Sequence, residues 1–389
     1  MTSSLTPEQA DKAKLDALNK FMKKATKDYD TNVAPLSSNQ KVDVDVIPTG
    51  AISLDYILGV GGIPRGRLTE IYGPSQGGKT TLALEIAAQC QAMGGIVGFI
   101  DAEHALNRQL TEAIGVDPDR FVVAQPDYGE QAADLARDMA NSGVFDMIII
   151  DSAASMTPKA EIEAESEQQF MGLQARLLSR FCRTIISPIA ENNVALVVLN
   201  QVRRDLGSYG APERAAGGSG LGFYAALRVE VRTSNSKQIK VGSEVIGTTV
   251  TAKVTKSKLS SPFRVCHYDV RWGKGIDATA GIIEVAQGLG IIERVNNTYW
   301  LRERGVNLDK VEEKLAVGQP KLMAALEDDE ALFTDVEAAV KAKLHVDTRP
   351  VDNEAADQST GAEEGTASTP PTSTVTDANE DDFFGLGSD

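Results

Sequence analysis

The chain of 389 residues is 42% hydrophobic and 24% charged, proportions that are typical of a globular protein with two or three domains, and its net charge is −16. No apolar run of about 18 residues exists, which excludes a membrane-spanning helix, and the N-terminal stretch lacks the apolar core of a signal peptide. The separated Cys90, Cys182 and Cys266 fit buried thiols better than a disulfide or metal framework. We therefore expect a cytoplasmic protein that does not contact a membrane.

The negative charge is concentrated at the C-terminal end. Residues 346–389 contain eleven acidic residues and one arginine, so they carry ten of the sixteen net negative charges. This segment is also polar and rich in proline and threonine, a composition that predicts a disordered acidic tail. Because the rest of the chain carries a net charge of only −6, its composition is compatible with a basic groove for a nucleic acid.

The N-terminal region predicts one helix. Residues 7–30 place the apolar Leu15, Leu18 and Phe21 in an amphipathic pattern. A stretch containing Ser and Asn follows and indicates a linker. We expect residues 1–41 to form a small N-terminal arm.

Residues 42–275 alternate short apolar strands with helical stretches, which is the pattern of βαβ units and predicts an α/β fold with a mainly parallel twisted sheet flanked by helices. The clearest strands are expected at 67–72, 95–101, 146–151 and 193–200. The clearest helices are expected at 80–93, 129–142 and 174–193. Alternating polar and apolar residues predict three more strands at one end of the sheet, at 227–233, 248–258 and 263–272. The mostly helical pattern of residues 276–345 predicts a small C-terminal α/β domain.

The most specific motif is GPSQGGKT, residues 73–80, which follows one predicted strand and opens a helix. In such a loop, backbone N–H groups and the helix N-terminus hold phosphates, Lys79 reaches the outer phosphates, and Thr80 ligates Mg²⁺. A chance glycine-rich turn is the alternative, which the flanking strand and helix disfavour. The predicted nucleotide site contains Gly73, Pro74, Ser75, Gln76, Gly77, Gly78, Lys79, Thr80 and Thr81.

Polar residues end three predicted core strands. Asp151, at the carboxyl edge of a parallel strand, can hold Mg²⁺, or it caps the next turn. Glu103 is placed to orient and polarise the water that attacks the γ-phosphate, and a salt bridge is the alternative for either acid. Asn200 and Gln201 end a third strand, where an amide can contact the γ-phosphate and the following loop, or can be an ordinary turn amide.

Basic residues form a further candidate site. Lys256 and Lys258 are two positions apart in a predicted strand, so both project from one face. Two ammonium groups on one face repel each other, so they either splay into solvent or serve a shared anion.

Two segments at the same edge of the sheet are candidates for contact with a nucleic acid. The first, at about 163–172, leads into a helix on which Arg176, Arg180 and Arg183 share one face, although this could be a plain solvated face. The second, at about 202–218, is basic and rich in glycine, whose backbone N–H groups can approach phosphates closely. Such loops beside an ATP site suggest single-stranded nucleic acid held mainly by its backbone.

Together these stretches resemble one family, the RecA-type recombinases of bacteria and phages, over about residues 42–345. The resemblance is carried by the following stretches: TGAISLDYILGVGGIPRGRLTEIYGPSQGGKTT, FIDAEHAL, QPDYGEQA, IIIDSAASMTPKAEIE, MGLQARLLS, NQVR, KVTKSKLSSPF and the glycine-rich run from Gly217 to Ala225. So many ordered motifs are far more specific than a phosphate loop alone.

The resemblance implies a DNA-dependent ATPase that uses ATP and Mg²⁺, forms helical filaments of itself on single-stranded DNA, and exchanges strands with homologous duplex DNA in recombination and repair. It implies that Glu103 is the catalytic glutamate and Gln201 the γ-phosphate sensor. Lys256 and Lys258 would reach the ATP of a neighbouring subunit, acting like an arginine finger. The SOS response, with a repressor or other repair proteins as partners, also fits the family.

The resemblance further implies contacts with DNA and between subunits. Residues 1–41 would dock on the adjacent subunit and Phe223 would lie at the subunit interface, while Leu206 would wedge between bases. The implied DNA-binding residues are Met171, Arg176, Arg183, Arg203, Leu206, Gly217 and Gly218.

The sequence departs from the family at several positions. Asn107 replaces the acid that faces adenine, Leu110 stands where a tyrosine is usual, and Gly222 replaces a lysine. Trp272 matches an aromatic position near the nucleotide and could stack on the base. These departures affect contacts with the base and between subunits rather than phosphate chemistry.

Two other functions use the same core. A hexameric DNA helicase or other ring motor is one alternative, which the N-terminal arm and the paired lysines disfavour. A scaffold that binds ATP without turning it over is the other, against which the intact set of Lys79, Asp151 and Glu103 argues.

Overall fold

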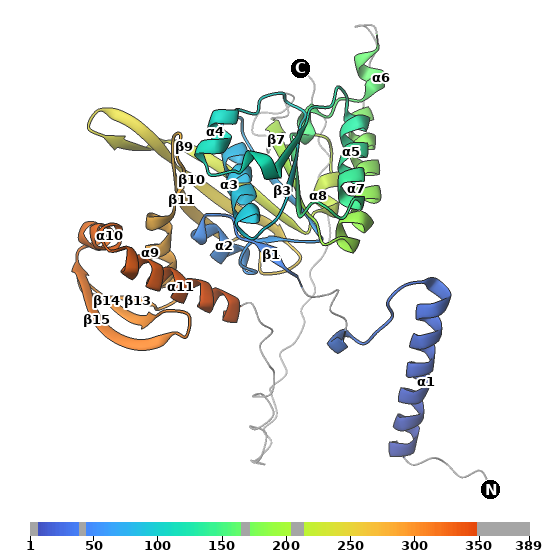
Figure 1. The fold of residues 1–389 in the computed structure, drawn as a ribbon, viewed down its shortest axis with the longest axis horizontal. Coiled ribbons are helices and arrows are strands. Elements are labelled where there is room, and N and C mark those ends of the chain that lie inside the picture. The colour runs from blue at the N-terminus through green and yellow to red at the C-terminus, as the bar shows by residue number, and fades with distance from the viewer. Residues whose placement is uncertain (1–6, 39–43, 165–171, 204–213, 348–389) are drawn as a thin grey trace, which may run out of the picture. The chain divides into compact units, whose positions relative to one another are not determined.

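The structure of the protein is a computed structural model that describes residues 7–38, 44–164, 172–203 and 214–347 (Figure 1). Ten strands in this part of the chain form one sheet, and six of them are parallel. In order across the sheet, the parallel strands are β9 (Leu227–Val241), β3 (Leu68–Gly73), β7 (Ala195–Arg203), β6 (Met147–Asp151), β4 (Val97–Asp101) and β5 (Phe121–Ala124).

The register of these strands determines which residues meet at the carboxyl edge of the sheet. Gly73 at the end of β3 is opposite Gln201 of β7, and Asp101 at the end of β4 is opposite Asp151 of β6. Ligand sites in parallel sheets form at this edge. The register therefore gathers the polar strand ends that the sequence singled out.

The sheet continues with antiparallel strands beyond β9. These are β10 (Glu244–Ser257), β11 (Val265–Arg271) and β12 (Gly275–Asp277). The short β8 (Arg214–Ala215) pairs with the end of β7. The strands predicted at one end of the sheet are therefore confirmed.

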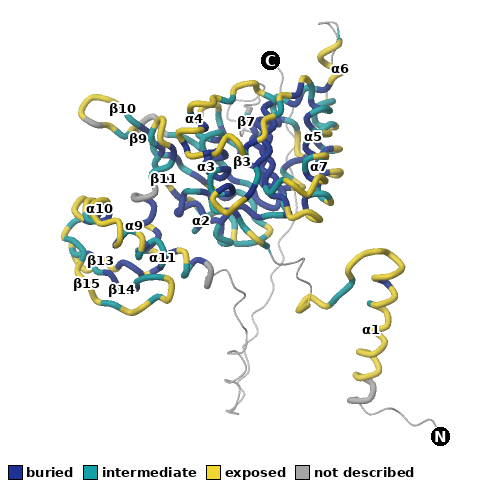
Figure 2. Tube along the Cα trace, in the orientation of Figure 1, coloured by how far each residue is buried: buried dark blue, intermediate teal, exposed yellow. Residues whose placement is uncertain are grey.

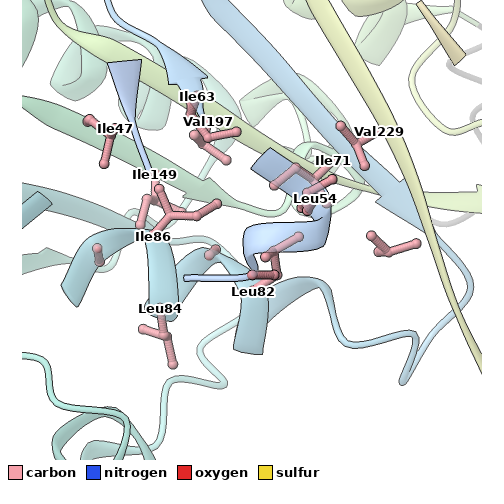
Figure 3. Close-up of a cluster of buried hydrophobic side chains, with 14 of the residues drawn as sticks. Ile47, Leu54, Ile63, Ile71, Leu82, Leu84, Ile86, Ile149, Val197 and Val229 are labelled. Carbon is pink, nitrogen blue, oxygen red and sulfur yellow. The ribbon is translucent and has the colours of Figure 1, made fainter. Parts of the chain in front are cut away.

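Helices cover both faces of the parallel strands. Successive strand residues point to opposite faces, so Ile149 of β6 joins Leu82 and Ile86 of α3 (Lys79–Ala92) in one buried cluster (Figure 3). Ile148 instead packs with residues of α5 (Gly129–Asn141) and α7 (Leu173–Glu191). This layering explains why the central strands read as continuous apolar runs, and Figure 2 shows them buried beneath helices with exposed outer surfaces.

The spacing of apolar residues explains how α5 and α7 lie on the sheet. On α5 the buried side chains are Ala132, Ala136 and Ala140, four positions apart, so a stripe of small residues allows close packing. On α7 larger residues recur at helical spacing, namely Leu178, Phe181, Cys182, Ile185 and Ile189.

Residues 278–347 contain a second, smaller sheet. Strands β13 (Ile292–Val295), β14 (Thr298–Arg304) and β15 (Asp309–Val317) are antiparallel. Helices α9 (Ala278–Gly288), α10 (Gln319–Asp328) and α11 (Glu330–Asp347) accompany it, and Tyr299 and Leu301 lie in the shared core. The α/β character predicted for this region is confirmed, although its strands were not individually predicted.

The remaining elements are short, apart from α1. They are β1 (Val46–Ile47), α2 (Ile52–Leu58), β2 (Ile63–Pro64), α4 (Arg108–Ala113), α6 (Lys159–Ile162) and α8 (Gly220–Tyr224), with 3₁₀ turns at 36–38, 118–120 and 153–155. Helix α1 (Pro7–Tyr29) agrees with the predicted helix, and its Leu15, Leu18 and Phe21 side chains are exposed. Among the described helices, none has the length and apolarity needed to cross a membrane.

Candidate active site

A pocket of about 260 Å³ lies at the carboxyl edge of the parallel strands. One side is the phosphate loop from Ser75 to Thr81, and the ends of three strands add Glu103, Asp151 and Gln201. The remaining wall comes from β9, β10 and β11 and the residue after β11, with Thr233, Thr248, Val250, Val270 and Trp272. Residues that are separated by up to about half of the chain therefore share one cavity.

The loop is shaped by its glycines and by the start of α3. Gly78, which precedes the first residue of α3, has φ 88°, a left-handed conformation that favours glycine. The Lys79 ammonium donates to the carbonyls of Pro74 at 2.7 Å and Gly73 at 3.3 Å. Burial lowers the pKa of Lys79, and the nearby carboxylates of Asp151 and Glu103 oppose this effect. The cation is thus held over a loop whose N–H groups form an anion site.

Thr80 and Asp151 fit a divalent cation. Thr80 Oγ1 donates to Asp151 Oδ2 over 2.7 Å, and burial raises the pKa of Asp151 to about 6, an effect to which the charge of Glu103 adds. A cation beside this carboxylate would favour its ionised form. No cluster of three or more His, Cys, Asp or Glu among the described residues could hold a metal. An ion here would therefore depend on phosphate oxygens, as Mg²⁺ sites in nucleotide-binding proteins do.

The structure separates the roles of the two acids that follow β4. Asp101 is buried and accepts from the backbone N–H groups of Ala105 and Leu106, so it fixes the turn after the strand. Glu103 instead faces the pocket, where its Oε1 accepts from Gln201 Nε2 at 2.7 Å and from Ser152 Oγ at 2.6 Å. Ser152 was not singled out in the sequence, although its place directly after Asp151 at a strand end was a usable signal.

Of the two residues predicted to contact the base, one lines the pocket and the other does not. Trp272 lines the pocket and is 61% exposed, so its ring is accessible to a ligand. Asn107 is not part of the described pocket wall, because its Oδ1 accepts from the Leu110 N–H and caps α4. Its contact with a nucleotide stays a prediction without geometric support.

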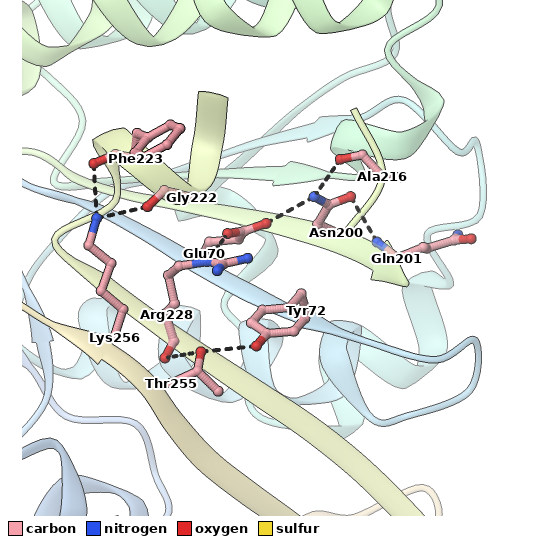
Figure 4. Close-up of polar contacts among 10 residues, drawn as sticks. All are labelled: Glu70, Tyr72, Asn200, Gln201, Ala216, Gly222, Phe223, Arg228, Thr255 and Lys256. Atoms are coloured by element: carbon pink, nitrogen blue, oxygen red, sulfur yellow. Dashed lines mark hydrogen bonds and ion pairs between the residues drawn. The ribbon is translucent and has the colours of Figure 1, made fainter. Parts of the chain in front are cut away.

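Lys256 lines a second pocket, of about 750 Å³, instead of the phosphate-loop pocket. Its ammonium donates to the carbonyls of Gly222 at 2.7 Å and Phe223 at 2.9 Å (Figure 4). Burial together with the cations Lys258 and Arg228 lowers its pKa. Lys258 lies one residue beyond β10, so the prediction that a strand holds both lysines is wrong for Lys258. Among the described residues, neither lysine lines the phosphate-loop pocket of its own chain.

Phe223 lies on α8 at the edge of this second pocket. The residue is 74% exposed, so its ring is accessible from outside the chain. The position is compatible with a contact to another molecule, as the sequence predicted for a subunit interface.

The described ends of the two segments proposed to bind DNA, at Gly172 and at residues 217–218, lie at the first turns of α7. A Cβ atom at Gly217 would lie 2.2 Å from Leu178 Cδ1, and one at Gly218 would lie 3.0 Å from Ala175 Cβ. Both residues also have a positive φ, 77° and 81°, a conformation that favours glycine. The side chain of Gln174 donates to the Ala154 carbonyl just after β6 at 2.9 Å. This packing connects both segments to the strand that carries Asp151.

The structure describes some of the other residues predicted to bind DNA and not the rest. Arg176 and Arg183 are exposed on α7, and the backbone of Arg203 ends β7, opposite Arg214 of β8. Met171 and Leu206 lie outside the described residues.

Comparison with known proteins identifies the family. A family profile for the RecA N-terminal domain matches residues 16–277. The proteins named RecA of Thermus thermophilus, Clostridioides difficile and Acinetobacter baylyi are 42%, 39% and 38% identical to the chain. These matches cover 85%, 85% and 86% of the chain and 95%, 93% and 93% of the respective relatives. The chain therefore belongs to the RecA family of DNA recombination and repair proteins.

Proposed function

We propose that the chain is a DNA-dependent ATPase that forms helical filaments on single-stranded DNA and catalyses homologous pairing and strand exchange. The observation that carries this proposal is the meeting of Lys79, Thr80, Asp151, Glu103 and Gln201 in one pocket. A cation for phosphates, two oxygen ligands for a metal, a carboxylate and an amide are the groups that phosphoryl transfer to water requires.

In the proposed reaction, Lys79 holds the outer phosphates of ATP, and Glu103 orients and polarises the attacking water. Ser152 and Gln201 hold the Glu103 carboxylate by donating to Oε1. Thr80 and Asp151 would bind Mg²⁺, which when bound would neutralise charge on the phosphates. Gln201 could exchange its bond to Glu103 for one to the γ-phosphate and thereby report the state of the nucleotide to the segment at 202–218.

We further propose that the ATP lies between subunits. Lys256 and Lys258 would complete the site of a neighbouring copy, since Lys256 occupies a different pocket from the phosphate loop of its own chain. Exposed Phe223 and the exposed apolar side chains of α1 would contact adjacent copies. A head-to-tail contact that uses two different surfaces generates a helical polymer when it does not close.

The DNA would be held by the segments at about 163–172 and 202–218. Arginine side chains and glycine N–H groups would contact the phosphates, leaving base edges free to test a homologous duplex. The proposed organisation is an arm at 1–41, an ATPase core at 42–275, a small domain at 276–345 and an acidic tail at 346–389, in a protein of the cytoplasm. Co-cleavage of a repressor stays an open proposal for a further partner.

Nothing in the described part of the chain favours the ring-helicase alternative. Electron microscopy with single-stranded DNA and a slowly hydrolysed ATP analogue separates the two functions, because a recombinase forms helical filaments and a helicase forms closed rings. Stimulation of ATP hydrolysis by single-stranded DNA is expected in parallel. Its absence would favour the non-hydrolysing scaffold.

A further inference from the structure

Glu70 lies in the middle of β3 and has no exposed surface, yet it is an acid. Its Oε1 accepts from Asn200 Nδ2 at 2.9 Å, and its Oε2 accepts from Arg228 Nε at 2.6 Å. A buried carboxylate is costly unless charged and polar partners satisfy it. Figure 4 shows that these two partners come from the strands on either side of β3, namely β7 and β9.

Hydrogen bonds of Asn200 connect Glu70 to the nucleotide pocket. Asn200 Oδ1 accepts from the backbone N–H of Gln201 at 2.9 Å, and its Nδ2 also donates to the Ala216 carbonyl at 3.0 Å. The Ala216 N–H in turn donates to the Gln201 carbonyl at 2.8 Å. The position of Glu70 therefore affects both Gln201 and the end of the segment at 202–218.

Arg228 connects Glu70 to the second pocket, which its side chain lines. A Cβ atom at Gly222 would lie 3.3 Å from Arg228 Cζ, so the guanidinium packs directly against the residue whose carbonyl accepts from Lys256. Arg228 also lies over the Tyr72 ring at 4.7 Å, and Tyr72 Oη donates to Thr255 Oγ1, next to Lys256, at 3.0 Å. The guanidinium therefore supports the backbone and side chains around Lys256.

We propose that Glu70 is a positioning residue that couples the two halves of the nucleotide interface. It couples the position of Gln201, which faces the nucleotide of its own chain, to the position of Lys256, which faces the nucleotide of a neighbour. Displacement of Gln201 and Asn200 would move the Glu70 carboxylate, and Arg228 would follow because it is paired with the other oxygen. This inference rests on the proposed function, because it assigns the coupling between two sites of that filament.

Glu70→Gln tests the role of the carboxylate. Glutamine has one acceptor oxygen and one donating amide group, so it can accept from Asn200 or from Arg228, while its donor faces the other donor. The measured quantity is the ratio of affinities for a fluorescent oligothymidylate with ATPγS and with ADP. We expect this ratio to fall about tenfold or more in Glu70→Gln, the range of typical coupling between sites.

Glu85→Gln is the matched control. Glu85 is also a buried acid, but its Oε1 accepts from the backbone N–H of Ile276 at 2.6 Å, outside this network. This variant is expected to keep the wild-type affinity ratio. Equal losses of the ratio in both variants would show a general effect of removing a buried charge and would overturn the role of Glu70.

Arg228→Lys provides a second test in case Glu70→Gln does not fold. Arg228 is partly exposed, and lysine keeps the charge while removing the Nε–H donor. We expect the same direction of change, and no further loss in the double variant if both residues act through one link. A folded variant of either kind that keeps the wild-type ratio would overturn the inference. If the wild-type protein binds the oligothymidylate equally well with ATPγS and with ADP, the proposed function itself would be overturned.

Discussion

Gln201 donates from Nε2 to Oε1 of Glu103 over 2.7 Å, joining the ends of β7 and β4, which lie on either side of β6. Ser152 donates to the same oxygen. These two hydrogen bonds fix the orientation of the Glu103 carboxylate at the pocket. The proposed base and the proposed sensor are thus in direct contact, so a nucleotide that displaces one affects the other.

Glu103→Gln is expected to abolish turnover and keep nucleotide binding. The amide preserves the size of the side chain but cannot accept a proton, and loss of general base catalysis costs about 10²–10⁴-fold in rate. Steady-state hydrolysis on single-stranded DNA and equilibrium binding of ATP measure the two effects separately. Filaments should become longer-lived because ATP persists in them.

Glu112→Gln is the control for this prediction. Glu112 is an acid at the end of α4 that pairs with Arg108 and does not line the pocket. It should leave the hydrolysis rate unchanged. Retained turnover in Glu103→Gln would contradict the assignment of Glu103 as base.

Asp151→Asn is expected to raise the stability of the metal-free protein at neutral and alkaline pH. Burial raises the pKa of Asp151 from 3.8 to about 6, so the native state holds this proton more tightly than the unfolded state does. The stabilising contribution of the protonated form is present below pH 4 and is lost as pH rises through 6. The ionised carboxylate therefore costs up to about 3 kcal/mol above pH 6, which asparagine avoids.

Thermal or urea unfolding in the presence of EDTA measures this difference. The advantage of Asp151→Asn should shrink to about half at pH 5 and disappear below about pH 4. The same variant should lose the Mg²⁺ dependence of ATP binding, since the amide is a weak ligand for the ion. Equal stability of the two proteins at pH 8 would show that the buried charge is not unfavourable.

Trp272→Ala is expected to weaken nucleotide binding about tenfold, because stacking of an aromatic ring contributes about 0.5–1.5 kcal/mol beyond burial. The chain has two tryptophans, and Trp300 lies on β14, with Arg302 over its ring at 5.6 Å. Trp300→Phe is therefore both the control and a single-tryptophan reporter. Its fluorescence should change when ADP is added, and an unchanged spectrum would place the base elsewhere.

Patterns in the sequence predicted the parts of the site that depend on local structure. The phosphate loop needs a strand before it and a helix after it, and Asp151, Glu103 and Gln201 each end or follow an apolar strand, so the edge of a parallel sheet brings them together. Glu70 and Arg228 could not be found in this way, because their roles depend on which strands are neighbours, whereas Ser152 directly follows a strand end and was overlooked. A buried acid in the middle of an apolar strand such as β3 was nevertheless a signal, since it requires a cationic partner.

Mixing two inactive variants tests whether the ATP site is shared between copies. Lys79→Ala removes the phosphate-loop cation but keeps Lys256, whereas Lys256→Ala keeps the phosphate loop and removes the cation offered to a neighbour. Each variant alone should lose DNA-stimulated hydrolysis. In an equal mixture, roughly a quarter of head-to-tail contacts would combine an intact loop with an intact Lys256, and activity should return in that proportion.

Lys253→Ala, which removes an exposed lysine of β10 outside both pockets, should keep full activity by itself. Mixtures that remain inactive while still forming filaments would show that Lys256 does not act on the ATP of a neighbouring copy.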